Sequence, residues 1–343
     1  MTATELRVPS SSSAEPTTWR RLTALVVTVA ALAGILVTAF AWPAVNAEPR
    51  DVPIGLAAPP EAAGAITAAL EQAQPGAFDV REVADEQAAR AAVSSRELLG
   101  AIVVGPEGGT VLTAPAAGAP IAQALDAVAV ALSRAFAQQQ GTAPAEPFFT
   151  VEAVVPLAPG DPRGAGFSSS VLPVVLVSLA VGILGALAIG GTVRRLLFVG
   201  AAAVGAALVV ALVADSWLGV LDGGWWAQAA VVALAIAAAG AGVVGLGAAL
   251  GRAGIGIAVA VVMLLGNPLS GAAVPPELLP AGWSELGQAL PPGAFVDAMR
   301  SVAYFGGADA ATPLLVLGAW VAGGVALVLV GGAVRGRRAQ RRA

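Results

Sequence analysis

The sequence predicts an all-α membrane bundle of six transmembrane helices, with one extracytoplasmic α/β domain inserted between helices 1 and 2. Three observations predict this fold: charged residues are few, apolar residues lie in long blocks, and arginines flank those blocks. Of the 343 residues, 57% are hydrophobic and only 12% are charged, whereas a soluble domain carries roughly a quarter charged residues. We therefore expect the chain to be embedded in a lipid bilayer, which is its expected partner.

The apolar blocks define the expected helices, because a helix needs roughly 20 apolar residues to cross about 30 Å of hydrocarbon. Six blocks without Asp, Glu or Arg approach or exceed this length, at residues 22–42, 171–190, 196–213, 226–250, 255–272 and 313–332. Asn267-Pro268 interrupts the fifth block. The first block also resembles a secretory signal that ends in a cleavable Val45-Asn46-Ala47, but its apolar run is longer than the roughly 7–15 residues of a signal core. We expect it to be retained as a helix.

The distribution of arginines predicts the orientation. With the N-terminus inside, the cytoplasmic segments hold 11 of the 18 arginines and two of the 22 acids, and the other side holds 7 arginines and 20 acids. Cytoplasmic loops carry the excess of basic residues, so both termini are expected in the cytoplasm. The Lys-free, Ala/Gly-rich composition favours a bacterial cell and its plasma membrane.

The two termini are predicted to differ in structure. Residues 1–21 form a polar N-terminal segment that is expected to be disordered. Residues 333–343 form a basic tail, which either anchors the last helix or contacts anionic lipid headgroups.

Residues 45–168 form the only segment large enough for a separate domain. Strands are predicted at 52–56, 78–83 and 149–155, a hairpin at 102–104 and 111–113 around Gly108-Gly109, and helices at 61–74, between Asp85 and Gly100, and along Ile121, Leu125, Val128, Leu132 and Phe136. Strands that alternate with helices indicate a small α/β sandwich. The domain holds 14 acids and 6 arginines, a balance that is unsuited to nucleic acid.

The residue types present exclude several chemistries. The chain has no Cys and no His, which removes thiolate and imidazole catalysis and the usual zinc sites. Without Lys it cannot contain the phosphate-binding loop of P-loop ATPases. No arrangement of catalytic groups is evident, so we expect neither an enzyme nor a cofactor.

Glycines and uncharged helices bear on transport and assembly. Ion-coupled transporters keep ionisable residues at membrane depth, and the predicted spans contain none, so the energy for any transport would come from a partner. Glycine is dense in and around the spans, for example at Gly240, Gly242, Gly245, Gly247 and Gly251. Small residues allow close helix packing, which predicts contacts inside the bundle, with a homodimer interface as the alternative.

A proline-rich stretch before the last span, residues 273–307, is predicted to lie at the outer rim of the bundle; we call it the rim segment. With the adjoining break in the fifth span it supplies the candidate functional residues: Asn267, Pro268, Pro276, Glu277, Pro280, Trp283, Pro291 and Arg300. A short amphipathic helix is expected to end near Met299-Arg300. Asp297 and Arg300 are three residues apart on it, which predicts a local ion pair.

The motif Asn267-Pro268, Gly271, Pro276-Glu277-x-x-Pro280, Trp283, Leu290-Pro291-Pro292 and Arg300 resembles the end of ABC-2-type transporter permeases. The resemblance is closest to the phage-infection-protein (Pip) group, which shares the plan of one span, a large outside domain and five further spans. Asp161-Pro162-Arg163-Gly164 is similar to a junction in actinobacterial members. The resemblance implies export or cell-envelope work, as a dimer with a separate ATP-binding subunit.

Two features depart from the ABC-2 pattern. Those permeases engage their ATPase through an amphipathic N-terminal helix and a helical loop between spans two and three. Residues 1–18 show no amphipathic pattern, and the corresponding loop is only about 191–195.

The sequence therefore supports two hypotheses. The first is an ABC-2-like permease component that exports a hydrophobic or cell-envelope substrate with energy from a partner. The alternative is a membrane-anchored envelope or surface-interaction protein, similar to a phage receptor, without transport activity.

Overall fold

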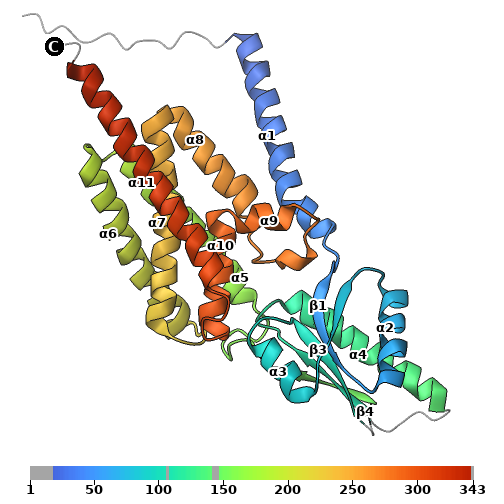
Figure 1. The fold of residues 1–343 in the computed structure, drawn as a ribbon. Helices are drawn as coiled ribbons and strands as arrows, with labels where there is room; N and C mark the ends of the chain where they lie inside the picture. Colours follow the sequence, from blue (N-terminus) through green and yellow to red (C-terminus); the bar gives the residue numbers. More distant parts are fainter. Residues whose placement is uncertain (1–17, 106–107, 141–146, 341–343) are drawn as a thin grey trace, which may run out of the picture.

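The computed structural model describes residues 18–105, 108–140 and 147–340, which form a helical bundle and an α/β domain at one end of it (Figure 1). The bundle helices are α1 (Trp19–Val45), α5 (Ala165–Leu187), α6 (Thr192–Ala211), α7 (Trp225–Leu250), α8 (Arg252–Ala260), α10 (Pro291–Tyr304) and α11 (Ala311–Gln340). Two π-helical turns extend α6 and α8: η1 (Leu212–Trp217) and η2 (Val261–Gly266).

Helices extend into both of the terminal segments that the sequence analysis set apart from the spans. α1 begins at Trp19, so residues 19–21 are helical rather than disordered, and the rest of the predicted disordered segment lies outside the described residues except for residue 18. α11 continues to Gln340 through most of the predicted tail, 333–343. The start of α1 and the end of α11 lie on the same side of the bundle, away from the α/β domain (Figure 1).

Six helices in the described part of the chain are long and apolar enough to cross a membrane: α1, α4 (Ala119–Gln140), α5, α6 with η1, α7 and α11. Five of them match predicted spans, but α4 packs on the sheet of the α/β domain. The span expected at 255–272 is instead a shorter apolar helix, Arg252–Gly266. It ends early because Pro268 has no amide hydrogen to donate and the backbone turns at Gly271, where φ is 83°.

α7 is the central helix of the bundle and contacts α5, α6, α10 and α11. Its glycines pack inside the bundle: a Cβ on Gly245 would lie 2.7 Å from the carbonyl oxygen of Gly324 in α11. Gly247 packs against Ile255 in the same way, at 2.9 Å. Gly251 has another role, because it ends α7 with a φ of 67°.

α1 differs from the other bundle helices. It stands apart from them in Figure 1, and its contacts include η2 and the short helix α9 (Trp283–Gln288). Large apolar side chains are exposed along its length. A helix of this kind can be stable in lipid but would be costly in water.

The α/β domain contains one five-stranded sheet with helices packed on it, which confirms an α/β domain between α1 and α5. Its elements are β1 (Val52–Ala57), α2 (Pro60–Ala73), β2 (Phe78–Glu82), α3 (Glu86–Ser94), β3 (Gly100–Gly105), β4 (Gly108–Thr113), α4 and β5 (Phe149–Ala153). The strand order is β2-β1-β3-β4-β5. All neighbours are parallel except the β3–β4 hairpin, in which Gly105 pairs with Gly108.

One predicted helix boundary in this domain is wrong. Asp85 caps α3 as expected and accepts a hydrogen bond from the Ala88 amide at 2.8 Å. The helix then ends at Ser94, whereas Gly100 is already the first residue of β3. Arg96 ends α3 in a left-handed conformation, with φ 64°, a position that usually holds Gly.

Candidate functional site

The rim segment connects η2 to α11 and lies against both parts of the protein. It contains the 3-10 turn η3 (Pro276–Leu278), α9 and α10. Pro276 and Pro291 occupy first-turn positions of η3 and α10, where the missing proline amide would have no partner in any case. α10 is buried over nearly its whole length and contacts α7 and α11. The segment is therefore partly an internal element of the bundle rather than a surface rim.

The structure distributes the predicted site residues over several places. Asn267 and Pro268 follow η2, where the Asn267 carbonyl accepts a hydrogen bond from the Ser270 hydroxyl at 2.8 Å. Pro280 precedes α9, and Trp283 begins that helix and stacks on Trp42 of α1, with ring centroids 5.3 Å apart. Pro276 and Glu277 in η3 and Arg300 in the second half of α10 lie at the junction with the α/β domain. Pro291, at the start of α10, lies inside the bundle beside Val174, Ala235 and Val262.

The rim segment and the α/β domain share one hydrophobic core. Leu278 of η3 and Phe305, just after α10, are buried in the same cluster as the sheet residues. The chain that leaves α1 adds backbone hydrogen bonds: the Glu48 amide donates to the Leu278 carbonyl at 3.1 Å, and the Arg50 amide donates to the Glu277 carbonyl at 3.3 Å. The domain is thus held on the bundle by packing and by backbone pairing.

Arg96 adds a charged contact that the sequence did not reveal. Its guanidinium forms an ion pair with Asp297 at 2.6 Å, donates to the Ser301 hydroxyl, and lies 5.3 Å from the centre of the Phe305 ring. The expected local pair between Asp297 and Arg300 is therefore wrong: Asp297 faces the α/β domain and bonds Arg96 instead. A helix-spacing rule cannot identify a partner that lies 201 residues away.

Arg300 and Glu277 are the two ionisable groups of the predicted set at this junction. The Arg300 side chain is only 7% exposed, and its guanidinium lies 5.5 Å from the centre of the Phe167 ring. Burial lowers the pKa of Arg300 to about 10, opposed by the negative charge of Glu277, so Arg300 is charged at neutral pH. Burial also raises the pKa of the Glu277 carboxyl, opposed by hydrogen bonding to the backbone and then by Arg300.

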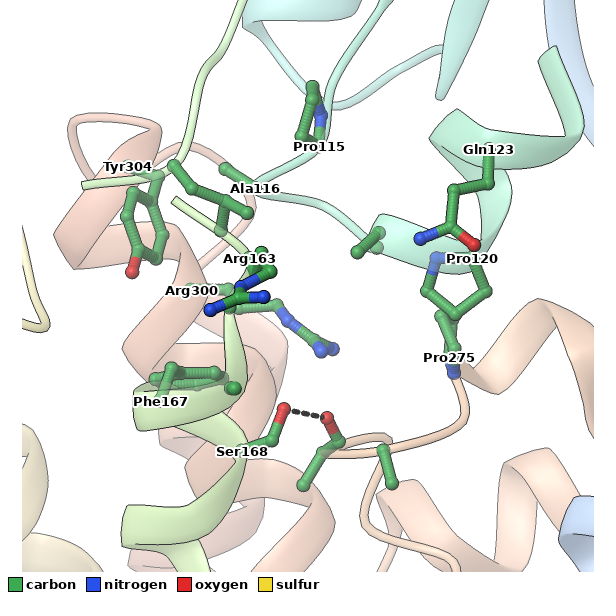
Figure 2. Close-up of a pocket in the computed structure, with 17 residues that line it drawn as sticks. Pro115, Ala116, Pro120, Gln123, Arg163, Phe167, Ser168, Pro275, Arg300 and Tyr304 are labelled. Carbon is green, nitrogen blue, oxygen red and sulfur yellow. Dashed lines mark hydrogen bonds between the residues drawn. The ribbon is translucent and has the colours of Figure 1, made fainter. Parts of the chain in front are cut away.

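A cavity of about 210 Å³ separates the α/β domain from the bundle beside Arg300 (Figure 2). Its walls come from the start of α4, the chain between β5 and α5, the first turn of α5, the turn after η2, and the end of α10. The lining includes Gln123, Arg163, Ser168, Arg300 and Tyr304. The Ser168 hydroxyl donates to the Ala272 carbonyl at 2.7 Å, which joins two of these walls.

A second, larger hollow of about 620 Å³ lies between α1 and the η2–α9 region. Its lining is apolar apart from Thr38 of α1, and it includes Leu264, Leu265 and Leu269. Trp42 and Trp283, which stack on each other, line it as well. An apolar hollow of this size suits a hydrocarbon-like ligand.

The described residues contain no group of three or more Asp or Glu side chains that could hold a metal ion. Two guanidinium groups lie at the cavity beside Arg300, and an apolar hollow lies between α1 and the η2–α9 region. No family model, curated protein or solved structure matches the chain.

Proposed function

We propose that the chain is an ABC-2-like, Pip-like permease component of a bacterial plasma membrane, which exports a hydrophobic or cell-envelope substrate with energy from a partner. The apolar hollow between α1 and η2–α9 carries this proposal. It lies between a helix that stands apart from the bundle and the short-helix segment whose motif resembles ABC-2 permeases. The hydrocarbon chains of such a substrate would be shielded from water in this hollow, which is favourable.

The proposed orientation follows from charge. Among the described residues, the helix starts that lie away from the α/β domain carry Arg20 and Arg21 (α1), Arg194 and Arg195 (α6) and Arg252 (α8), and the domain and rim segment carry most of the acids. The positive-inside rule then favours cytoplasmic termini and an extracytoplasmic α/β domain. The protein would perform no chemistry on its substrate and would act through movement of α1 relative to the bundle.

The first prediction concerns the partner. Purification of the tagged full-length chain from its own membranes in a mild detergent is expected to recover an ATP-binding subunit, identified by mass spectrometry. The variant Arg194→Glu, which changes an arginine in the first turn of α6, is expected to reduce that recovery, because Arg194 is exposed at the proposed cytoplasmic face. Repeated recovery of the intact chain without any ATP-binding protein would contradict ATP-driven export.

One observation favours the alternative, a surface-interaction protein without transport. α5 ends at Leu187 and α6 begins at Thr192, so the loop between them offers an ATPase only four residues, 188–191. The same purification distinguishes the two functions, because an envelope-interaction protein would bring down cell-surface components and no ATPase.

The second prediction concerns the hollow itself. Thr38→Trp would place an indole in it, whereas Thr28→Trp adds the same ring on α1 away from its lining. In nanodiscs that contain a lipid with a photoreactive group on its acyl chain, wild-type protein is expected to be labelled at residues 264–269. Labelling there should fall in Thr38→Trp and persist in Thr28→Trp, each measured relative to labelling of the lipid-exposed face of α6. Equal labelling in the two variants would show that the hollow holds no hydrocarbon chain.

A further inference from the structure

The cavity between the α/β domain and the bundle collects positive charge from several segments. Arg163 comes from the chain before α5, and Arg300 comes from the end of α10 (Figure 2). The residues that line the cavity include no Asp or Glu. The cavity is thus bordered by two guanidinium groups and by no carboxylate.

Arg300 is buried without a hydrogen-bonding partner for its charge. Among residues 18–105, 108–140 and 147–340, no hydrogen bond or ion pair satisfies its guanidinium. Glu277 acts on it electrostatically but lies beyond the 4.0 Å of an ion pair. The Arg300 nitrogens are not among the fully enclosed unpartnered atoms of the described residues, so they reach the cavity. A ligand there that accepts hydrogen bonds would pair a charge that the protein leaves unpaired.

The Arg300 guanidinium lies against the backbone at Gly271 and an aromatic ring. Gly271 has a φ of 83°, and a Cβ built on it would lie 3.6 Å from Nη1 of Arg300. The Phe167 ring lies on another side of the guanidinium, 5.5 Å away. The group is therefore held in place by an aromatic face and by close backbone rather than by a carboxylate.

The N-termini of two helices add to the positive electrostatic potential in the cavity. Residues from the first turns of α4 and α5 line the cavity, namely Ala119, Pro120 and Ala165, Ser168. Neither helix has an acidic residue in its first turn. Asp161 accepts a hydrogen bond from the Phe167 amide at 2.8 Å near the start of α5. In the first turn of α4, Pro120 has no amide hydrogen and the Ile121 amide donates to the Gly118 carbonyl at 3.0 Å, so α4 acts on a ligand mainly through its helix dipole. The partial positive charge of a helix N-terminus favours bound anions.

We propose that this cavity binds a phosphate group, held by Arg163 and Arg300 and supported by the N-terminus of α4. Guanidinium groups that come from two segments suit a tetrahedral oxyanion, which presents acceptors in several directions. The cavity of about 210 Å³ holds several water-sized groups, which is room for a phosphate. The phosphate can belong to a lipid headgroup or to a small soluble molecule. This site does not depend on the proposed export function.

Binding of inorganic phosphate to the full-length protein in an uncharged detergent tests the site, by titration calorimetry and by thermal shift, with sodium chloride at equal ionic strength as the reference. Arg163→Gln is expected to weaken binding about tenfold, the loss of one charge-assisted contact. Because Arg163 is exposed and forms no ion pair with a described residue, this change should leave the fold intact. Arg300→Gln is expected to abolish binding.

Two further variants separate binding from folding. Arg194→Gln removes an exposed arginine at the other end of the bundle and should bind phosphate like the wild type. Glu277→Gln removes the negative charge that acts on Arg300 and should bind phosphate several-fold more tightly. A gain in affinity cannot arise from partial unfolding.

A lipid experiment distinguishes the source of the phosphate. Native mass spectrometry of protein released from nanodiscs of phosphatidylcholine with phosphatidylglycerol should show retained phosphatidylglycerol if the site takes a lipid headgroup, with loss in Arg163→Gln. Binding of inorganic phosphate without retained lipid would assign a soluble ligand. The proposal is overturned if the wild type neither binds phosphate nor retains anionic lipid, or if Arg163→Gln and Arg194→Gln behave alike.

Discussion

Replacing Arg96 with alanine is expected to loosen the α/β domain from the bundle and to lower the free energy of unfolding by about 2–3 kcal/mol, between the values for exposed and buried ion pairs. The side chains of Arg96 and Asp297 are 12% and 27% exposed, so water screens their interaction only partly. The substitution would leave the Asp297 carboxylate without its partner at 2.6 Å and remove the contact with the Phe305 ring.

The measurement is thermal unfolding together with hydrogen exchange in the same detergent. Amides near Leu278 and Phe305, in the shared core, should exchange faster in Arg96→Ala, while those in the middle of α7 should not change. Arg81→Ala is the matched control, because its ion pair with Asp79 is exposed on both sides, at 51% and 46%. The double variant Arg96→Ala/Asp297→Ala should be less destabilised than the sum of the single variants.

The left-handed backbone at Arg96 gives a second comparison. Glycine adopts a positive φ without the steric cost that a Cβ imposes, so Arg96→Gly should be more stable than Arg96→Ala by roughly 1 kcal/mol. Both lose the same charged contacts. If Arg96→Ala were no less stable than Arg81→Ala, the ion pair would have no part in docking the domain.

The position of Arg96 also shows where sequence reasoning ended. The alternation of strands and helices in 45–168 predicted the α/β domain, since those patterns depend on neighbours along the chain. The residue that ends α3, by contrast, is an arginine where the pattern predicts a glycine. Its conformation is stabilised by contacts with α10, and such contacts leave no local signal.

The rim segment shows the same limit at the candidate site. Its prolines predicted an irregular stretch between the fifth and last spans, and the structure has short helices there. The sequence did not indicate that α10 enters the bundle, or that Arg163 lies at the same cavity as Arg300. These two arginines are far apart in sequence, and each taken alone suggests only a solvated charge or a residue at a helix end. Only the fold brings them to one cavity.

α7 and α11 pack so closely that one added methyl group at their contact should destabilise the bundle. A Cβ on Gly324 would lie 2.4 Å from the carbonyl carbon of Ala241 and 2.8 Å from its Cβ. Real Cβ atoms do not approach backbone so closely, so Gly324→Ala must push the two helices apart. Overpacking of this kind costs about 1–3 kcal/mol, and in a membrane the lost van der Waals contacts have no hydrophobic replacement.

The neighbouring residue supplies the control. A Cβ on Gly323 would have no heavy atom within 4 Å, so Gly323→Ala should leave stability unchanged or raise it slightly through helix propensity. Unfolding of both variants in the same detergent measures the difference. Gly245 and Gly324 face each other inside one chain, so this contact belongs to the packing of the bundle. If Gly324→Ala instead left the chain as stable as Gly323→Ala and altered only its oligomeric state, the glycines would belong to a contact between chains, and the packing of α7 on α11 described above would be wrong.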